Sequence, residues 1–242
     1  MKILAVNCSA GPDSCAVIEG GKIIASSYIN VKLTHSQTML PMIKEMLLSS
    51  LLNLDDIDAF AINSGPGSFT GIRIGISAIK GLAAPKDKPC FEVSTLDSIA
   101  QCFAGFDCTI CAVMDARCNQ VYNRIYKIQK GEVLPITDNR AVMVSDVEEE
   151  LENIEGKIVI AGDGAKLFKT FAEQKGNVTL AREPLSFQNA VGTALVAEKL
   201  SETTKGISQT DLKPFYLRLP QAERELKLAR AKHNTPSKQN FR

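Results

Sequence analysis

The sequence lacks tryptophan and has only two histidines among its 242 residues, His35 and His233. A Ser-His-Asp triad, or a metal site built from imidazoles, needs histidine beside other reactive side chains. Two histidines so far apart in the sequence nearly exclude both kinds of site. His35 precedes a predicted helix and His233 lies near the end of the chain, so we expect both to be solvated. We therefore predict no catalytic residue and no metal.

Long hydrophobic runs are also missing. No stretch approaches the roughly 18 apolar residues that a membrane-crossing helix needs. The apolar start, Met1 to Val6, is too short for the core of a signal peptide. We expect a cytoplasmic protein without membrane contact.

Neither sign of charge dominates. The chain has 28 Lys and Arg against 27 Asp and Glu, for a net charge of +1, so it has no global basic footprint for nucleic acid. The distribution is uneven, because basic residues outnumber acidic ones in residues 220–242. A basic, polar segment at the end of a chain is usually a solvated, flexible tail, and we predict one there.

The seven cysteines are an odd number and are scattered along the chain, which suits a reducing compartment. Cys108 and Cys111 have the spacing of a zinc or redox pair. They fall in a predicted strand, however, where positions three apart face opposite sides of the sheet. We expect these cysteines to be small buried apolar residues.

The hydrophobic content of 45% is enough for one large domain or two small lobes. The predicted order β-β-β-α-β-α occurs twice, and we divide the chain into a first lobe of residues 1–106, a second of 107–219 and the tail of 220–242. The last helix, 187–200, is expected to pack back on the first lobe. In the first half we predict strands at 1–7, 14–19, 22–30, 59–62 and 90–94, with helices at 36–54, 68–84 and 95–103. In the second half we predict strands at 109–115, 120–128, 132–136 and 157–161, with helices at 145–151, 164–174 and 187–200.

The most informative stretch runs from Asn63 to Gly75, NSGPGSFTGIRIG. Gly65 and Gly67 allow backbone angles that other residues avoid, and Ser68 can cap the helix that follows. A glycine-rich turn between a strand and a helix, with Glu92 further on, also has the spacing of a dinucleotide-binding loop. Pro66 weakens that interpretation because it removes a backbone amide.

The two helices on either side of this turn carry more apolar residues than one buried face needs. In the helix of 36–54, positions 40, 43, 47, 51 and 54 form one stripe, which leaves Met39, Met42 and Met46 over. These methionines are either core filler or a second face that packs on another subunit. In the next helix, Gly71, Gly75 and Ala78 form a smooth ridge that would let a helix from outside approach closely.

Four segments resemble one known family. SGPGSFTGIRIG, the opening MKILAVNCS, the segment MDARCNQVY from Met114 to Tyr122 and the closing PFYLR at 214–218 are similar to the TsaB (YeaZ) family of the glycoprotease-like (Kae1-like) superfamily. They occur in the family's order over residues 1 to about 223. The resemblance implies an α/β fold with two lobes, that of the actin-like ATPases (ASKHA, RNase H-like).

The resemblance also implies a role. Members of this family are non-catalytic scaffold subunits in the synthesis of threonylcarbamoyladenosine on tRNA. They pair with TsaD, which transfers the threonylcarbamoyl group to the adenosine beside the anticodon, and the ATPase TsaE joins them. We therefore expect a TsaD-like and a TsaE-like partner, indirect contact with tRNA (for which the basic tail is a lesser candidate), and a homodimer when the chain is alone. The expected partner surface is Met39, Met42, Ile43, Met46, Ser68, Thr70, Ile72, Arg73 and Ile76.

The actin-like fold binds ATP between its lobes and uses a carboxylate after the first strand to organise magnesium. Here that position is Asn7, which brings no negative charge. The residues nearest a nucleotide would be Asn7, Ser9, Asp115, Gly162 and Gly164. TsaD carries a metal-binding His-x-x-x-His motif, whereas residues 93–100 of this chain contain no histidine. We expect no resident cofactor, with ATP or ADP bound only at the interface of the assembled complex. The alternative is a nucleotide-binding enzyme, either an actin-like phosphotransferase or a Rossmann-like NAD-dependent one.

Overall fold

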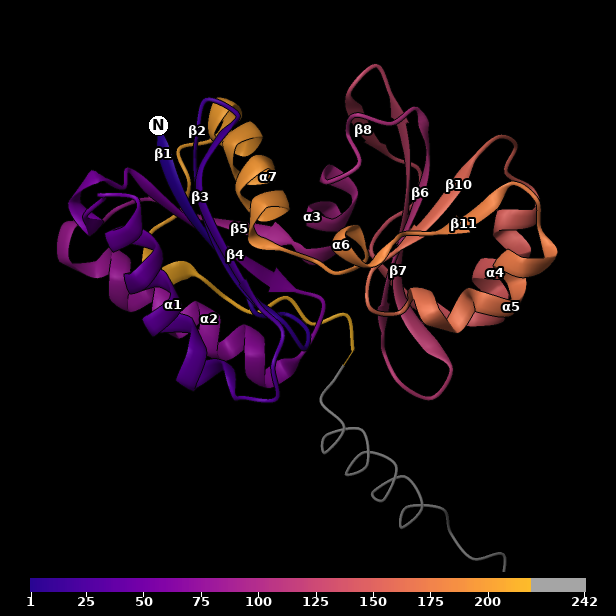
Figure 1. Cartoon of the computed structure of the whole chain (residues 1–242), viewed down its shortest axis with the longest axis horizontal. Coiled ribbons are helices and arrows are strands. Elements are labelled where there is room, and N and C mark those ends of the chain that lie inside the picture. Colours follow the sequence, from indigo (N-terminus) through magenta and orange to yellow (C-terminus); the bar gives the residue numbers. More distant parts are fainter. Residues whose placement is uncertain (219–242) are drawn as a thin grey trace, which may run out of the picture.

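Two β-sheets, one in each half of the chain, organise the molecule into two lobes (Figure 1). The computed structural model describes residues 1–218, apart from the side chain of Pro184. The basic tail predicted at 220–242 lies outside the described residues.

The first lobe is built on a five-stranded sheet in the order β3-β2-β1-β4-β5. The first three strands form antiparallel hairpins, and β1, β4 and β5 run parallel. Gly20 and Gly21 make the tight turn between β2 and β3, each with positive φ, as the sequence predicts. The strands are β1 (Lys2–Asn7), β2 (Asp13–Glu19), β3 (Lys22–Ile29), β4 (Ala59–Gly65) and β5 (Cys90–Ser94).

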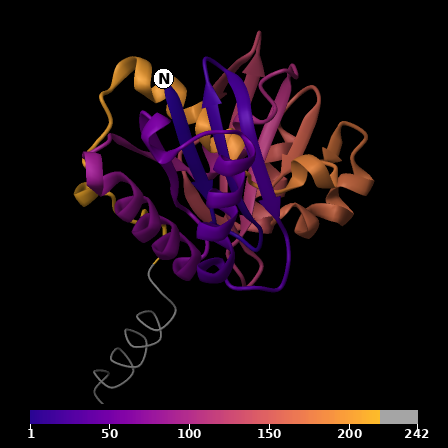
Figure 2. The same cartoon turned by 60° about the vertical axis from the view of Figure 1, so that its left-hand side comes forward.

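Four helices accompany this sheet. The helices α1 (His35–Ser49) and α2 (Phe69–Ala83) lie side by side on one face, as Figures 1 and 2 show. On the opposite face lies α7 (Ala190–Thr203), and α3 (Thr95–Gln101) packs between α7 and the second lobe. The predicted helix of 36–54 is longer than the observed α1. Helix α1 ends at Ser49 because the chain reverses at Leu51, whose φ is 56°.

The second lobe repeats the arrangement in the order β11-β10-β6-β7-β8, with β9 also paired to β7. Two of its strands, β9 and β11, are absent from the sequence prediction. Its strands are β6 (Cys108–Asp115), β7 (Gln120–Gln129), β8 (Glu132–Pro135), β9 (Arg140–Met143), β10 (Ile158–Ala161) and β11 (Val178–Leu180). Its helices are α4 (Val144–Glu152), α5 (Lys169–Gln174) and α6 (Glu183–Ser186). In the described chain as a whole, 3-10 turns lie at Leu54–Asp56, Ala84–Lys86, Ala165–Phe168 and Gln209–Asp211.

The two strand orders correspond position by position, since β6, β7, β8, β10 and β11 take the places of β1, β2, β3, β4 and β5. In both lobes an antiparallel hairpin is followed by parallel strands that helices connect. The fold is thus the duplicated, two-lobed actin-like one, and this expectation is confirmed. The Rossmann-like alternative is wrong, because antiparallel β2 and β3 occupy one side of the first sheet. Glu92, its candidate ribose-binding acid, instead accepts a bond from the backbone amide of Lys213.

The end of the described chain belongs to the first lobe. Small residues of α7, among them Ala190, Ala194 and Ala197, pack on the first sheet. The segment after it, residues 204–218, is called the strap below. Ile207 of the strap forms a β-bridge with Cys90, and Leu212 lies in the first lobe's core. The expected second lobe of 107–219 is therefore too long.

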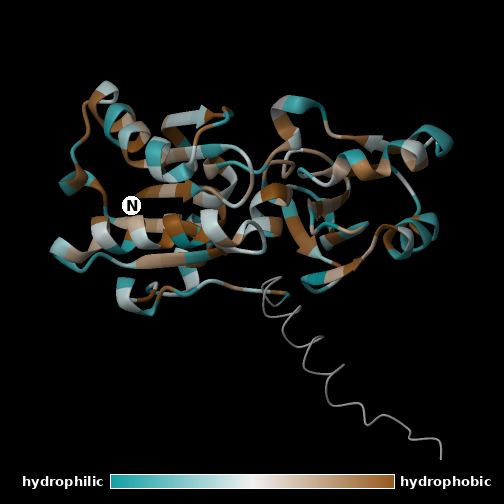
Figure 3. Cartoon of the chain, turned by 90° about the horizontal axis from the view of Figure 1, so that it is seen from below, coloured by the Kyte–Doolittle hydropathy of each residue, from teal (hydrophilic) through white to brown (hydrophobic). Residues whose placement is uncertain are grey.

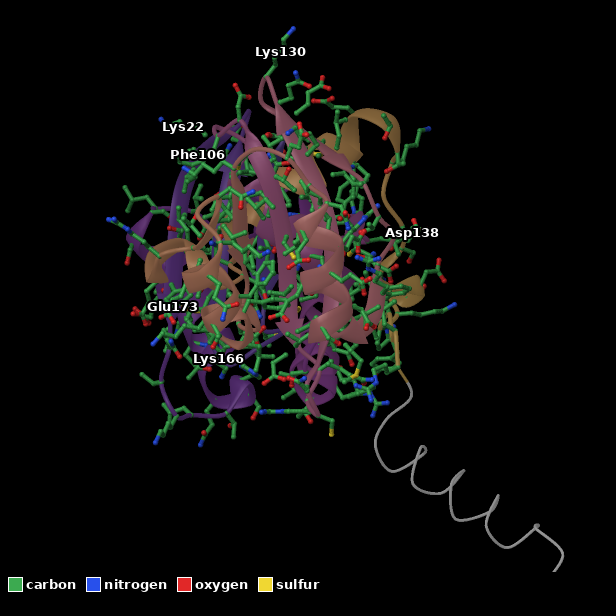
Figure 4. All side chains as sticks on the ribbon, turned by 90° about the vertical axis from the view of Figure 1, so that its right-hand side faces the viewer. Lys22, Phe106, Lys130, Asp138, Lys166 and Glu173 are labelled. Atoms are coloured by element: carbon green, nitrogen blue, oxygen red, sulfur yellow. The ribbon has the colours of Figure 1, made fainter. Side chains whose placement is uncertain are left out.

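Apolar segments concentrate on the strands inside both lobes, and hydrophilic ones lie toward the outside (Figure 3). The outer surface of the second lobe carries charges of both signs, among them Lys130, Asp138, Lys166 and Glu173 (Figure 4). None of the helices between residues 1 and 218 combines the length and apolar character that crossing a bilayer requires.

Candidate functional site

The turn between β4 and α2 is packed tightly against the loop after β1. Ser68 caps α2, as predicted, since its Oγ accepts a hydrogen bond from the Gly71 amide at 3.2 Å. The Ser68 amide donates to the Ser9 carbonyl at 2.7 Å. A Cβ on Gly67 would lie 2.3 Å from the Ser9 oxygen. The amides of Ser68 and Gly71 thus already have acceptors within the chain. Gly67 allows the close contact between this turn and the loop after β1.

The small-residue ridge of α2 faces inward, not outward as the sequence analysis expected. A Cβ on Gly71 would lie 2.0 Å from the carbonyl oxygen of Cys8, and one on Gly75 would lie 2.5 Å from the Cys8 sulfur. The Cys8 thiol donates to the Gly71 carbonyl at 3.0 Å. The helix approaches the end of β1 as closely as glycine allows.

The buried face of α1 matches the predicted stripe only in part, since Ile43 and Leu47 are buried as expected. Met39 is 1% exposed, Met42 and Met46 are buried beside it, and all three belong to the first lobe's core. Leu40 of the predicted stripe is instead 49% exposed. Two stripes of α1 are apolar enough to be buried, and only packing on β2 and β3 selects between them.

The nine residues expected to bind a partner therefore separate into two groups. Three lie on the surface: Ser68, Thr70 and Arg73. Six are buried in the first lobe and could face a partner only after rearrangement, so the structure lends their assignment no support: Met39, Met42, Ile43, Met46, Ile72 and Ile76.

An exposed face remains on the helix pair, and we call it the outer face. It combines apolar, hydroxyl and charged side chains. Leu40 and Leu48, 49% and 57% exposed, are its large apolar residues. Its members are Leu40, Lys44 and Leu48 of α1, and Thr70, Arg73 and Ser77 of α2.

The strap borders this outer face. Arg73 donates a hydrogen bond from Nε to the hydroxyl of Tyr216 at 2.7 Å. The ring of Tyr216 lies against that of Phe69, with centroids 4.6 Å apart. The closing PFYLR motif therefore meets the glycine-rich motif in space, which no local pattern in the sequence indicates.

A cleft of about 880 Å³ separates the lobes at the N-terminal end of α2. Of the predicted nucleotide-proximal residues, Ser9 and Asp115 line it. Asn7 is buried beneath, and its Oδ1 accepts bonds from the amide and the hydroxyl of Ser9. Asp163, between Gly162 and Gly164, lines the cleft too. Lys32, His35 and Arg117 also line it, although the sequence analysis did not place them near a nucleotide.

The glycines at 162 and 164 act inside the second lobe. A Cβ on Gly162 would lie 1.8 Å from the Val113 carbonyl oxygen, and one on Gly164 would lie 3.0 Å from the Asp115 amide. Between them, Asp163 accepts a bond from the Asp115 amide at 3.4 Å. Burial raises the pKa of Asp163 to about 6, so a fraction of this carboxyl is protonated near neutral pH.

His35 is held in place instead of being solvated, contrary to expectation. Its Nδ1 lies 2.6 Å from Oδ1 of the buried Asp13, and Thr38 donates to the other oxygen of that carboxylate. The hydrogen bond to Asp13 raises the pKa of His35. The pair fastens the start of α1 to the start of β2.

Cys108 and Cys111 lie on opposite faces of the second sheet, as predicted, because they belong to different core clusters. Burial raises the pKa of Cys111 to about 12, so its thiol stays protonated near neutral pH. Among residues 1–218, no three side chains of His, Cys, Asp or Glu gather as metal ligands.

Comparison with known proteins gives consistent results. The family model described as TsaD, tRNA N6-adenosine threonylcarbamoyltransferase, matches residues 23–225. The tRNA threonylcarbamoyladenosine biosynthesis protein TsaB of Escherichia coli K12 is 31% identical over 90% of this chain and 95% of its own length. TsaB of Bacillus subtilis 168 is 28% identical over 92% and 96%.

A solved structure of YeaZ from Pseudomonas aeruginosa superposes with a TM-score of 0.75 at 26% identity, covering 89% of this chain and 99% of that one. The agreement spans both lobes and includes the glycine-rich turn and the closing motif. The chain belongs to the TsaB family of tRNA threonylcarbamoyladenosine biosynthesis proteins, within the wider family that the TsaD model describes.

Proposed function

We propose that this protein is a non-catalytic scaffold subunit that binds and activates a TsaD-type threonylcarbamoyltransferase, with a TsaE-type ATPase as third member. In this role it contacts tRNA only through the complex. The family assignment supports the pathway, and the surface of the first lobe supports the docking role.

The reactive groups support a role without chemistry of its own. The imidazole of His35 is engaged by Asp13, and burial raises the pKa of Cys8 and Cys15 to about 12. A nucleophile needs an accessible group with a base beside it. Ser68, the most prominent hydroxyl of the glycine-rich motif, accepts a helix-capping bond.

The observation that carries the docking proposal is the exposure of Leu40 and Leu48 on α1, together with exposed Arg73 on the neighbouring α2. Leu40 and Leu48 are about two helical turns apart on the same side of α1, and a helix pair from a protein of the same fold can pack on such a stripe. This replaces the methionines of the sequence analysis, although the two helices stay the same. In the absence of the partner, we propose that the same stripe pairs with itself in a two-fold homodimer.

Replacing Leu40 and Leu48 together by Asp tests the docking proposal. Charges buried in an apolar contact without partners cost several kcal/mol. We expect the affinity for the purified TsaD-type protein to fall at least about 100-fold, and the homodimer to become a monomer in sedimentation velocity.

Leu134→Asp is the matched control, because Leu134 is 47% exposed on β8 of the second lobe. It should bind like the unchanged chain. Equal affinity for the double variant and the control would remove the outer face from the interface.

The cleft between the lobes favours a second candidate, an actin-like phosphotransferase. Its volume of about 880 Å³ suits a nucleotide. Asn7 at the place of the magnesium-organising carboxylate argues against it. Tight binding of ATP by the isolated chain in calorimetry would favour the enzyme over the scaffold. A nucleotide seen only in the assembled complex would fit a site shared by both partners.

A further inference from the structure

A group of buried polar side chains at the junction of the lobes has hydrogen-bonding atoms without a partner in the described chain. The atoms are Asn7 Nδ2, Asn63 Nδ2, Thr95 Oγ1 and both amide atoms of Gln188. Each of the four residues is at most 2% exposed. We call them the junction cluster. The same condition holds for Thr109 Oγ1, which lies apart from them in β6.

Asn7 and Asn63 are neighbours on the first sheet. Strands β1 and β4 are parallel, with Val6 opposite Ile62, so the two asparagines follow at equivalent positions. Ala5 and Ala61, two residues earlier on each strand, pack with α7. Because side chains alternate along a strand, both asparagines lie on that same face of the sheet.

The other two members adjoin a hydrogen-bond network that links Asn63 to α3 and to the start of α7. Thr193 of α7 donates to Oδ1 of Asn63, and its hydroxyl lies 3.1 Å from that of Ser98 in α3. Thr95 is one helical turn before Ser98 and shares its face. Gln188 directly precedes Asn189, the N-cap of α7, whose carbonyl accepts a bond from Ser98 at 3.2 Å.

The orientation of the Asn7 amide follows from its neighbours. Its Oδ1 accepts from the Ser9 amide at 3.1 Å and from the Ser9 hydroxyl at 2.8 Å. A backbone N–H can only donate, so Nδ2 points the other way and needs an acceptor. A buried donor without an acceptor is costly, and native proteins satisfy nearly all of them.

We propose that the junction cluster binds ordered water, with at least one molecule accepting a hydrogen bond from Asn7 Nδ2 and bridging it to the other members. Water is the smallest ligand that both accepts and donates, which suits a cluster that offers amide donors, a hydroxyl and an amide oxygen. Ser9 lines the interlobe cleft, whereas Asn189 lines a separate hollow of about 460 Å³. The cluster therefore lies between two openings to solvent.

NMR of the full chain tests the proposal. The side-chain amide protons of Asn7 should show cross-relaxation with water of the sign that marks a bound, long-lived molecule. A high-resolution crystal structure should place a water within hydrogen-bond distance of Asn7 Nδ2. A direct bond from Asn7 Nδ2 to Oδ1 of Asn63, with no water between, would overturn the proposal.

Asn7→Ser replaces the side-chain amide by a shorter hydroxyl, which removes the amide donor and leaves room, so it should hold an additional water if the site is hydrated. A thermal-shift titration with chloride or phosphate separates water from an anion. The unchanged chain and Asn7→Ser should respond equally to added anion. Stabilisation confined to the unchanged chain would show that an anion occupies the site, and would equally overturn the proposal.

Discussion

At the scale of single residues, the contact between His35 and Asp13 links stability to pH. The hydrogen bond to Asp13 raises the pKa of His35 in the folded protein above its ordinary value of 6.5. The contribution of the pair is therefore complete below the pKa of the unfolded state and is lost as the pH rises through the folded pKa.

We expect the difference in unfolding free energy between the unchanged chain and His35→Gln to be largest near pH 6 and to shrink toward about pH 9. Urea unfolding at a series of pH values measures it. Lys44→Gln, which removes an exposed charge from the same helix, serves as control. A difference that stays constant with pH would mean that the ring stabilises by packing alone.

Residue types predicted part of this local geometry. Gly65 and Gly67 have φ of 138° and 152°, and Ser68 caps its helix, both as expected from NSGPGSFTG. The partner of His35 could not be predicted, because Asp13 lies 22 residues earlier in the sequence and pairing across such a separation leaves no local sequence pattern. The same holds for the contact of Arg73 with Tyr216.

At the scale of elements, the packing of α2 on β1 depends on Gly71. A Cβ there would meet the carbonyl oxygen of Cys8 at 2.0 Å, and a backbone atom in a buried strand end cannot move aside cheaply. We expect Gly71→Ala to destabilise the protein by about 1–3 kcal/mol, the usual cost of overpacking.

Gly81→Ala is the matched control on the same helix. A Cβ on Gly81 would meet no atom within 4 Å, so helix propensity alone should stabilise this variant, by at most about 1 kcal/mol. Chemical denaturation of both variants checks the pair. If Gly71→Ala did not lower the free energy of unfolding, α2 would have to be able to shift away from β1.

Helix α1 shows where element prediction fails. Its apolar residues fill two overlapping stripes, one through Met39, Met42 and Met46 and one through Leu40 and Leu47. Periodicity gives the helix but not its rotation about its own axis, which tertiary contacts decide. The strands β9 and β11, of four and three residues, were missed, although β8 and β10 of four residues each were predicted.

At the scale of the whole molecule, the strap completes the first lobe. Leu212 is 1% exposed within the core that also holds Leu4 and Phe60. We expect Leu212→Ala to lower the unfolding free energy by roughly 2–5 kcal/mol, the usual effect of a cavity at a leucine. Lys213→Ala is the control, since Lys213 contacts Glu92 through its backbone and its side chain is exposed.

Calorimetric unfolding of both variants measures the effect. A change of less than about 0.5 kcal/mol for Leu212→Ala, like that of an ordinary surface substitution, would mean that the strap lies on the lobe without contributing to its core.

The duplicated fold was predictable from the order of elements together with the family resemblance. The lobe boundary was not, because the sequence of the strap contains nothing that assigns it to one sheet or the other. Its place is known from observed contacts, such as those of Ile207 with Cys90 and of Phe215 with Ser64, which join it to the first lobe.

The return of the chain to the first lobe through α7 and the strap has a consequence for synthesis on the ribosome. A nascent chain that has emerged only as far as β5 has all five strands of its first sheet but neither α7 nor Leu212, so one sheet face and part of the core remain uncovered. The second lobe, whose residues are contiguous from β6 to α6, is complete earlier. The lobe translated first is therefore finished after the second one, and it stays dependent on protection from aggregation until α7 and the strap have been made.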